Sequence, residues 1–125
     1  MSIGLGVFGC GSPEEKPVDI YADDKCSYCG MTITKPIFAS EIVTDKEVLK
    51  FDDLSCLDSF KTKNHGILFR ATFVMDYRKK AWITFDKAFI VATGVATPMG
   101  SGLVAFSDTA SANTFARAHP PAKAM

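Results

Sequence analysis

Short runs of β-forming residues alternate with turn residues along the chain, and each half of the chain closes with a helical pattern. The first half predicts a hairpin followed by a helix, over residues 38–44, 47–51 and 54–63. Asp52 and Asp53 offer a side-chain cap for the start of this helix, and Gly66 follows its end. The second half predicts four strands and a second helix, over residues 69–75, 81–85, 88–92, 103–106 and 109–118.

The two halves share one spacing of aromatic and acidic residues, Phe51-x-Asp53-x6-Phe60 and Phe106-x-Asp108-x6-Phe115. In each copy a strand ends in Phe, an Asp caps the next helix, and a later Phe can return to the sheet. We therefore expect an α+β fold of antiparallel β-hairpins, each with a packed helix, arranged as two related ββα-type units.

The composition indicates one ordinary globular domain, because 47% of the 125 residues are hydrophobic and 22% are charged. The 14 basic and 14 acidic residues cancel, and no stripe of Lys and Arg is present. Nucleic acid is therefore not an expected partner, since phosphate binding needs clustered basic side chains. No apolar run reaches the length of about 18 residues that a transmembrane helix needs.

The N-terminus resembles the end of a bacterial lipoprotein signal. Residues 1–9 are apolar and glycine-rich, and Cys10 follows them directly as the expected acylation site. We expect residues 1–11 to be a signal remnant, 12–24 a flexible proline-containing tether, 25–118 a single metal-binding domain and 119–125 a C-terminal tail. This arrangement predicts a membrane-anchored lipoprotein in the cell envelope, facing the periplasm or the extracellular side.

The strongest chemical signal is a group of soft donors in six consecutive residues. Cys26 and Cys29 have C-x-x-C spacing, Gly30 allows a sharp turn, and the thioether of Met31 follows. Thiolates together with thioethers favour Cu(I), whereas thiolates alone suit zinc equally well. We therefore predict a soft-metal knuckle, a tight turn whose sulfur atoms hold Cu(I).

A second donor is expected from a distant loop. Met99 lies between small residues in the stretch 94–102, where a large apolar side chain has little core to fill. We therefore expect Met99 to reach the metal site. Cys56 falls between apolar residues of the first helix and is expected in the core, as is Met75.

Other functions remain open for the two cysteines of the knuckle. They could form a disulfide in an oxidising envelope, or a redox pair, although a thioredoxin-like motif opens a helix and this one does not. A structural zinc module needs four closed ligands, so Cys56, His65 or His119 would have to complete it. No nucleophile with a general base is apparent, so we do not expect an enzyme.

Several segments together resemble the NosL family over about residues 25–117. They are Cys10, Cys29-Gly-Met31, Asp76-Tyr77, Ala81-Trp82-Ile83, Asp86-Lys-Ala-Phe-Ile-Val91 and Pro98-Met-Gly100 through Phe106-Ser107. The resemblance implies a membrane-anchored copper-binding lipoprotein associated with maturation of nitrous oxide reductase. It also implies two small α+β units resembling part of organomercurial lyase. Cys29 and Met31 match the family's Cys-x-Met directly, while Cys26 is a thiol that relatives need not have.

These donors, taken together with the family resemblance, imply a copper chaperone that delivers Cu(I) to an envelope cuproenzyme such as nitrous oxide reductase. Cu(I) accepts low coordination numbers, and sulfur ligands hold it against harder competing metals. A site with Cys26, Cys29, Met31 and Met99 would release its weaker thioethers first and pass the ion by ligand exchange. Whether two chains share one ion as a homodimer remains open at this point.

Overall fold

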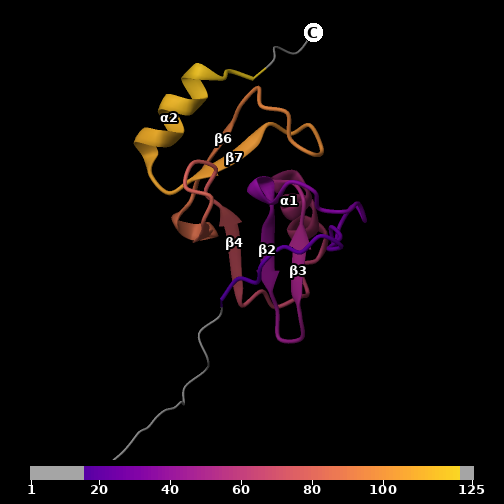
Figure 1. Cartoon of the computed structure of the whole chain (residues 1–125). Coiled ribbons are helices and arrows are strands. Elements are labelled where there is room, and N and C mark those ends of the chain that lie inside the picture. Colours follow the sequence, from indigo (N-terminus) through magenta and orange to yellow (C-terminus); the bar gives the residue numbers. More distant parts are fainter. Residues whose placement is uncertain (1–15, 122–125) are drawn as a thin grey trace, which may run out of the picture.

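The computed structural model describes residues 16–121, which form two antiparallel sheets and two α-helices. The larger sheet has the strand order β3-β2-β4-β5, formed by β2 (Ser40–Val43), β3 (Val48–Phe51), β4 (Ala71–Met75) and β5 (Trp82–Thr84). The smaller sheet is a hairpin of β6 (Phe89–Ala92) and β7 (Leu103–Phe106). Figure 1 shows the hairpin above one end of the larger sheet. Two short 3-10 helices precede β2 and β6, at Pro36–Phe38 and Phe85–Lys87.

Each α-helix begins at an aspartate that follows a strand. Asp53 caps α1 (Leu54–Lys63) by accepting a hydrogen bond from the backbone N–H of Ser55. Asp108 caps α2 (Thr109–Ala118) in the same way, through the N–H of Ser111. Both caps satisfy backbone donors that the first turn of a helix leaves without an internal partner.

The two helices pack on their strands through equivalent aromatic pairs. The ring of Phe60 on α1 lies 5.3 Å from the ring of Phe51, which ends β3. The ring of Phe115 on α2 lies 5.4 Å from that of Phe106, which ends β7. The predicted α+β class is confirmed, and the repeated spacing in the sequence corresponds to these two strand–strand–helix units.

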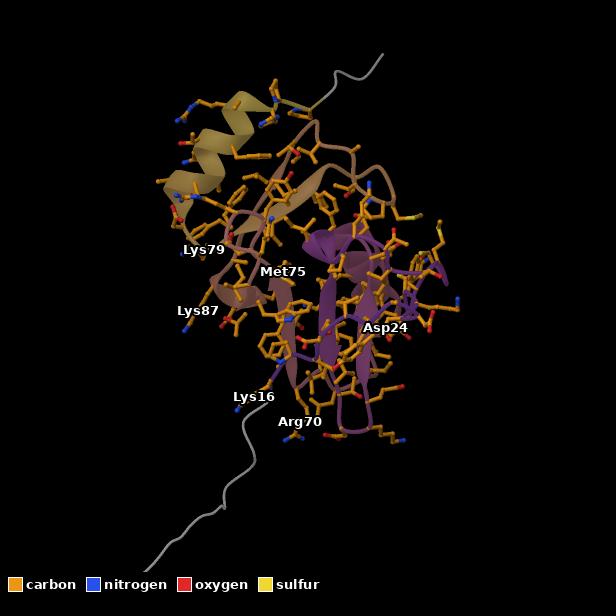
Figure 2. The ribbon with its side chains drawn as sticks, viewed as in Figure 1. Lys16, Asp24, Arg70, Met75, Lys79 and Lys87 are labelled. Atoms are coloured by element: carbon orange, nitrogen blue, oxygen red, sulfur yellow. The ribbon has the colours of Figure 1, made fainter. Side chains whose placement is uncertain are left out.

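The units meet where β4 ends, beside Met75 (Figure 2). The buried carboxylate of Asp76 accepts hydrogen bonds from the backbone N–H groups of Arg78 (2.8 Å), Lys79 (2.9 Å) and Ser107 (2.9 Å). Because Ser107 directly follows β7, its hydrogen bond to Asp76 connects the second unit to the first. Helix α1 also contacts both units, since it lies against β2, β3 and β7.

The described part of the N-terminal segment, residues 16–24, is hydrogen-bonded to the larger sheet. The N–H of Val18 donates to the buried carboxylate of Glu41 at 2.8 Å. Lys50 on β3 forms an ion pair with Asp24 at 2.6 Å, and Figure 2 shows Asp24 beside that strand.

Cys10 lies outside the described residues, so the acylation site and the proposed domain boundaries stay predictions. Over residues 16–121, no helix is both long and apolar enough to cross a bilayer.

Candidate metal centre

Four potential metal ligands meet where the knuckle lies against the start of α1. One atom each from Cys26, Cys29, Asp52 and Cys56 lies within 4.8 Å of the others. We call these four residues the thiol cluster. Cys26 and Cys56 are each 3% exposed and Asp52 is 2% exposed, whereas Cys29 is only half-buried. The cluster is therefore closed on most sides and reaches the surface through Cys29.

The knuckle is a tight turn closed by backbone hydrogen bonds. Lys25 and Thr32 form an antiparallel bridge across its base, and the N–H of Cys26 donates to the carbonyl of Met31 at 2.8 Å. Gly30 has a φ of +81°, in the left-handed region that favours glycine, and its N–H donates to the carbonyl of Cys26. This conformation turns the chain between the two thiols.

The larger sheet places the knuckle beside Asp52. The N–H of Ser27 donates to the carbonyl of Lys50 at 2.7 Å, and the N–H of Lys50 donates to Ser27 Oγ at 3.3 Å. Lys50 belongs to β3, and Asp52 directly follows the end of that strand. The knuckle therefore extends the edge of the sheet, with its cysteines next to the start of α1.

Hydrogen bonds connect two of the thiols to the carboxylate, and a backbone N–H of the knuckle to the third sulfur. Cys56 Sγ donates to Asp52 Oδ1 at 3.4 Å, and Cys29 Sγ lies 3.6 and 3.7 Å from the two oxygens of Asp52. The N–H of Cys29 donates to Cys26 Sγ at 3.4 Å. This last contact directs a backbone donor at one of the sulfur atoms of the cluster.

The surroundings keep two of the thiols protonated. Burial raises the pKa of Cys29 above its ordinary value, and Cys26 and the charge of Asp52 raise it further. Burial also raises the pKa of Cys56 strongly, and the neighbouring Cys26 and Asp52 act in the same direction. A catalytic thiol needs the opposite shift, because the thiolate is the nucleophile. These two cysteines therefore lack the activation that thiol–disulfide catalysis requires.

The two predicted thioethers are accessible from solvent. Met31, in the knuckle, is 56% exposed, and Met99, in the loop between β6 and β7, is 46% exposed. A methionine that filled the core would be buried, so neither side chain serves mainly for packing. Both sulfur atoms are free to reorient toward an ion or a partner.

A buried aspartate connects the Met99 loop to the start of α1. Asp53 Oδ2 accepts the N–H of Met99 at 2.8 Å, and Asp53 Oδ1 accepts the hydroxyl of Ser101 at 2.6 Å. Burial acts to raise the pKa of Asp53, but hydrogen bonds from Ser101, Ser55 and Met99 hold it below its usual value. Asp53 is thus a carboxylate that bridges two segments far apart in the sequence.

The structure brings Cys26 and Cys29 together as expected and adds two donors. Cys56 was expected in the core, and otherwise only as one of the residues that could complete a structural zinc site, while Asp52 was expected only as a helix cap. Cys56 is indeed buried, but it is buried against the other thiols rather than among apolar side chains alone. The four-residue spacing of Asp52 and Cys56 at a helix start was the available signal, since such residues share one face.

Neither histidine is among these four donors. His119 ends α2 and stacks on the ring of Phe115, with the ring centres 4.3 Å apart. His65 follows the end of α1, whereas the cluster lies at the beginning of that helix.

Comparisons with known proteins identify the family of the chain and a solved structure with a similar fold. The sequence profile of the NosL family matches residues 17–121. Among solved structures, the copper chaperone NosL from Shewanella denitrificans has a similar fold, with a TM-score of 0.73 and 21% sequence identity. The similarity covers 88% of this chain and 92% of the Shewanella chain. A search of curated proteins gave no match. The chain belongs to the NosL family.

Proposed function

We propose that this protein is a copper chaperone that binds Cu(I) at the thiol cluster. The observation that carries the proposal is the meeting of Cys26, Cys29 and Cys56 sulfur atoms within 4.8 Å. Soft sulfur ligands favour Cu(I) over harder cations. The structurally similar Shewanella protein is described as a copper chaperone, which supports the same role here.

The ligand set follows from burial and chemistry. Cys29 is the central ligand, because its thiol is the half-buried member of the cluster and precedes Met31 in the knuckle. Cys26 supplies a second thiolate, and Cys56 lies close enough to supply a third. Met31 and Met99 are weaker, exposed donors through which the ion enters and leaves. Binding and transfer of the copper ion make and break no covalent bond in a substrate molecule, so the protein is not an enzyme.

The recipient is a copper-dependent enzyme of the cell envelope, such as nitrous oxide reductase. The family resemblance and the lipoprotein-like Cys10 support this part of the proposal. An acylated Cys10 would hold the protein at the membrane, on the periplasmic or extracellular side. A homodimer that shares one ion between two knuckles is the alternative to transfer by a monomer.

Zinc is the second candidate, and Asp52 favours it. Three thiolates and a carboxylate form a closed four-ligand set that suits tetrahedral Zn²⁺. In a structural zinc site the apo protein would unfold, because metal binding and folding are coupled there. Here most of the buried apolar side chains lie outside the thiol cluster, among them Ile42, Phe51 and Phe106, so we expect the metal-free protein to stay folded.

One titration separates these functions. The reduced Cys10→Ser protein, which lacks the thiol outside the described residues, is titrated with Cu(I) against a chromophoric chelator, and with Zn²⁺ in parallel. Tight Cu(I) binding that Cys29→Ser abolishes supports the chaperone. Preferential Zn²⁺ binding, together with loss of the fold on chelation, would replace it with the structural zinc module. Insulin reduction by the metal-free protein would instead indicate redox catalysis.

A further inference from the structure

Asp53 makes more hydrogen bonds than a helix cap requires. Its Oδ1 atom accepts the N–H of Ser55 at 2.9 Å, which is the capping contact, and the hydroxyl of Ser55 at 3.0 Å. The remaining contacts come from the distant loop, through the N–H of Met99 and the hydroxyl of Ser101. Asp53 is fully buried, so water does not compete for these hydrogen bonds.

The equivalent residue of the second unit shows what capping alone looks like. Asp108 follows Phe106 as Asp53 follows Phe51, and it starts α2 as Asp53 starts α1. Among the described residues, the carboxylate of Asp108 accepts its hydrogen bond from the N–H of Ser111, at the start of its own helix. The contacts with Met99 and Ser101 are therefore an addition specific to the first unit.

The loop that Asp53 holds has a fixed shape. Gly102 has a φ of +72° and lies so close to Thr93 that an added Cβ would be 2.1 Å from the Thr93 carbonyl oxygen. The N–H of Gly102 donates to Thr97 Oγ1 at 3.0 Å, and Thr93 Oγ1 donates to the carbonyl of Gly102 at 2.8 Å. Hydrogen bonds at the base of the loop, together with those from Met99 and Ser101 to Asp53, therefore hold Met99 in one defined position.

The neighbour of Asp53 in the sequence touches the thiols. Asp52 accepts hydrogen bonds from Cys29 and Cys56, and the Cα atoms of consecutive residues are about 3.8 Å apart. Two adjacent carboxylates thus hold the thiols on one side and the backbone of Met99 on the other. We propose that Asp53 is a positioning residue of the copper site, which holds Met99 beside the thiol cluster so that its thioether can exchange Cu(I) with the thiolates.

This inference rests on the proposed function, and a double-mutant cycle tests it. Asp53→Asn keeps the size of the side chain but replaces one acceptor oxygen by an NH₂ group, which cannot accept the Met99 N–H. We expect Asp53→Asn and Met99→Ala each to weaken Cu(I) binding about tenfold, or about 1.4 kcal/mol. The double variant should bind no more weakly than Met99→Ala alone, because both changes remove the same ligand. X-ray absorption should show one fewer sulfur neighbour of copper in both single variants.

Asp108→Asn is the matched control, since it makes the same change at the equivalent helix cap without touching the loop. We expect copper affinity and the sulfur count to stay unchanged in this variant. Ser101→Ala is the second variant if Asp53→Asn does not fold, because it removes the 2.6 Å hydrogen bond from the loop side and leaves the Ser55 cap intact. It should weaken copper binding in the same direction, again without further effect in a Met99→Ala background.

Two results would overturn the positioning role while leaving the copper chaperone in place. One is unchanged affinity and sulfur count in Met99→Ala or Asp53→Asn. The other is full additivity of the two substitutions, which would mean that Asp53 acts through a different group. A wild-type protein that binds no Cu(I) tightly would instead overturn the proposed function together with this inference.

Discussion

The thiol of Cys56 donates a hydrogen bond to the carboxylate of Asp52, 3.4 Å away, across the start of α1. A metal that takes this sulfur must first displace its proton. Burial raises the pKa of both Cys56 and Cys29, so both are protonated at neutral pH in the metal-free protein. We therefore expect copper binding at the cluster to be coupled to proton release.

This coupling predicts that Cu(I) affinity rises with pH. Each thiol proton released should contribute about a tenfold increase per pH unit, measured by chelator competition between about pH 6 and pH 8. Asp52→Asn should raise the Cu(I) affinity at each pH in this range, because the charge of Asp52 helps to raise the pKa of Cys29 and makes its proton harder to displace. The same variant should weaken zinc binding if Asp52 is a zinc ligand. A pH-independent Cu(I) affinity would mean that copper binds without displacing these protons.

The three cysteines should differ in their effects on copper. We expect Cys29→Ser to abolish tight Cu(I) binding, and Cys26→Ser and Cys56→Ala to weaken it substantially. Thiolates contribute charge as well as polarisability, so their loss costs more than the loss of a thioether. Chelator competition on the Cys10→Ser background measures the series. If Cys56→Ala lowers stability but leaves copper affinity intact, Cys56 is a packing residue, as its place in α1 first suggested.

Met31→Ala should weaken Cu(I) binding by about tenfold, or about 1.4 kcal/mol, and leave the melting temperature nearly unchanged. The reason is that Met31 is exposed, so its truncation creates no cavity. Leu68→Ala is a matched control, because Leu68 is also an exposed apolar side chain and follows the far end of α1. Equal effects of the two substitutions on affinity would remove Met31 from the ligand set.

Asp76 should stabilise the fold without affecting the metal. Burial alone would raise the pKa of Asp76, but hydrogen bonds from Lys79, Ser107 and Arg78 hold it below its usual value. Its stabilising effect is therefore present above the pKa of the unfolded chain, about 3.9, and is lost as the pH falls through the lower folded-state pKa. Asp76→Asn should lower the free energy of unfolding at neutral pH by about 1–3 kcal/mol and reduce its loss in acid. Chemical denaturation across this pH range measures both effects, and copper affinity should not change.

Cys10→Ala tests the membrane anchor. The full-length protein with a functional export signal should fractionate with membranes, and the variant should move to the soluble fraction, because an acyl chain at Cys10 is the expected attachment. Cys29→Ala is the control, since it removes a thiol without removing the anchor. Membrane association that survives Cys10→Ala would contradict acylation at this position.

Local sequence patterns predicted most of the elements but not how they meet. Both helices match the expected ranges because Asp53 and Asp108 are strong caps. The strand expected from residue 38 begins only at Ser40, because Pro36 starts a 3-10 helix that includes Phe38. The junction at Asp76 could not be predicted, since its partner Ser107 lies 31 residues away and no periodic pattern marks the contact.

The candidate site was predictable to the same extent. Cys26 and Cys29 are close in sequence, so their spacing alone brings them together. Cys56 joins them only because the knuckle adds to the edge of β3, which is a tertiary contact. An apolar neighbourhood in the sequence, with Leu54 and Leu57, indicates burial correctly but does not say what the buried sulfur faces.

The half-exposure of Cys29 in an otherwise closed cluster separates how strongly copper is held from how fast it leaves. In the proposed copper site all three sulfur atoms contribute to the equilibrium constant, but an incoming ligand approaches from the side of Cys29, the half-buried member of the cluster. The residence time of the ion is then governed by how readily a competing ligand reaches the copper beside Cys29, whereas the affinity depends on the bonds to all three sulfur atoms. Substitutions around Cys29 can therefore change the rate of copper transfer with little change in affinity, and substitutions around Cys26 can do the reverse.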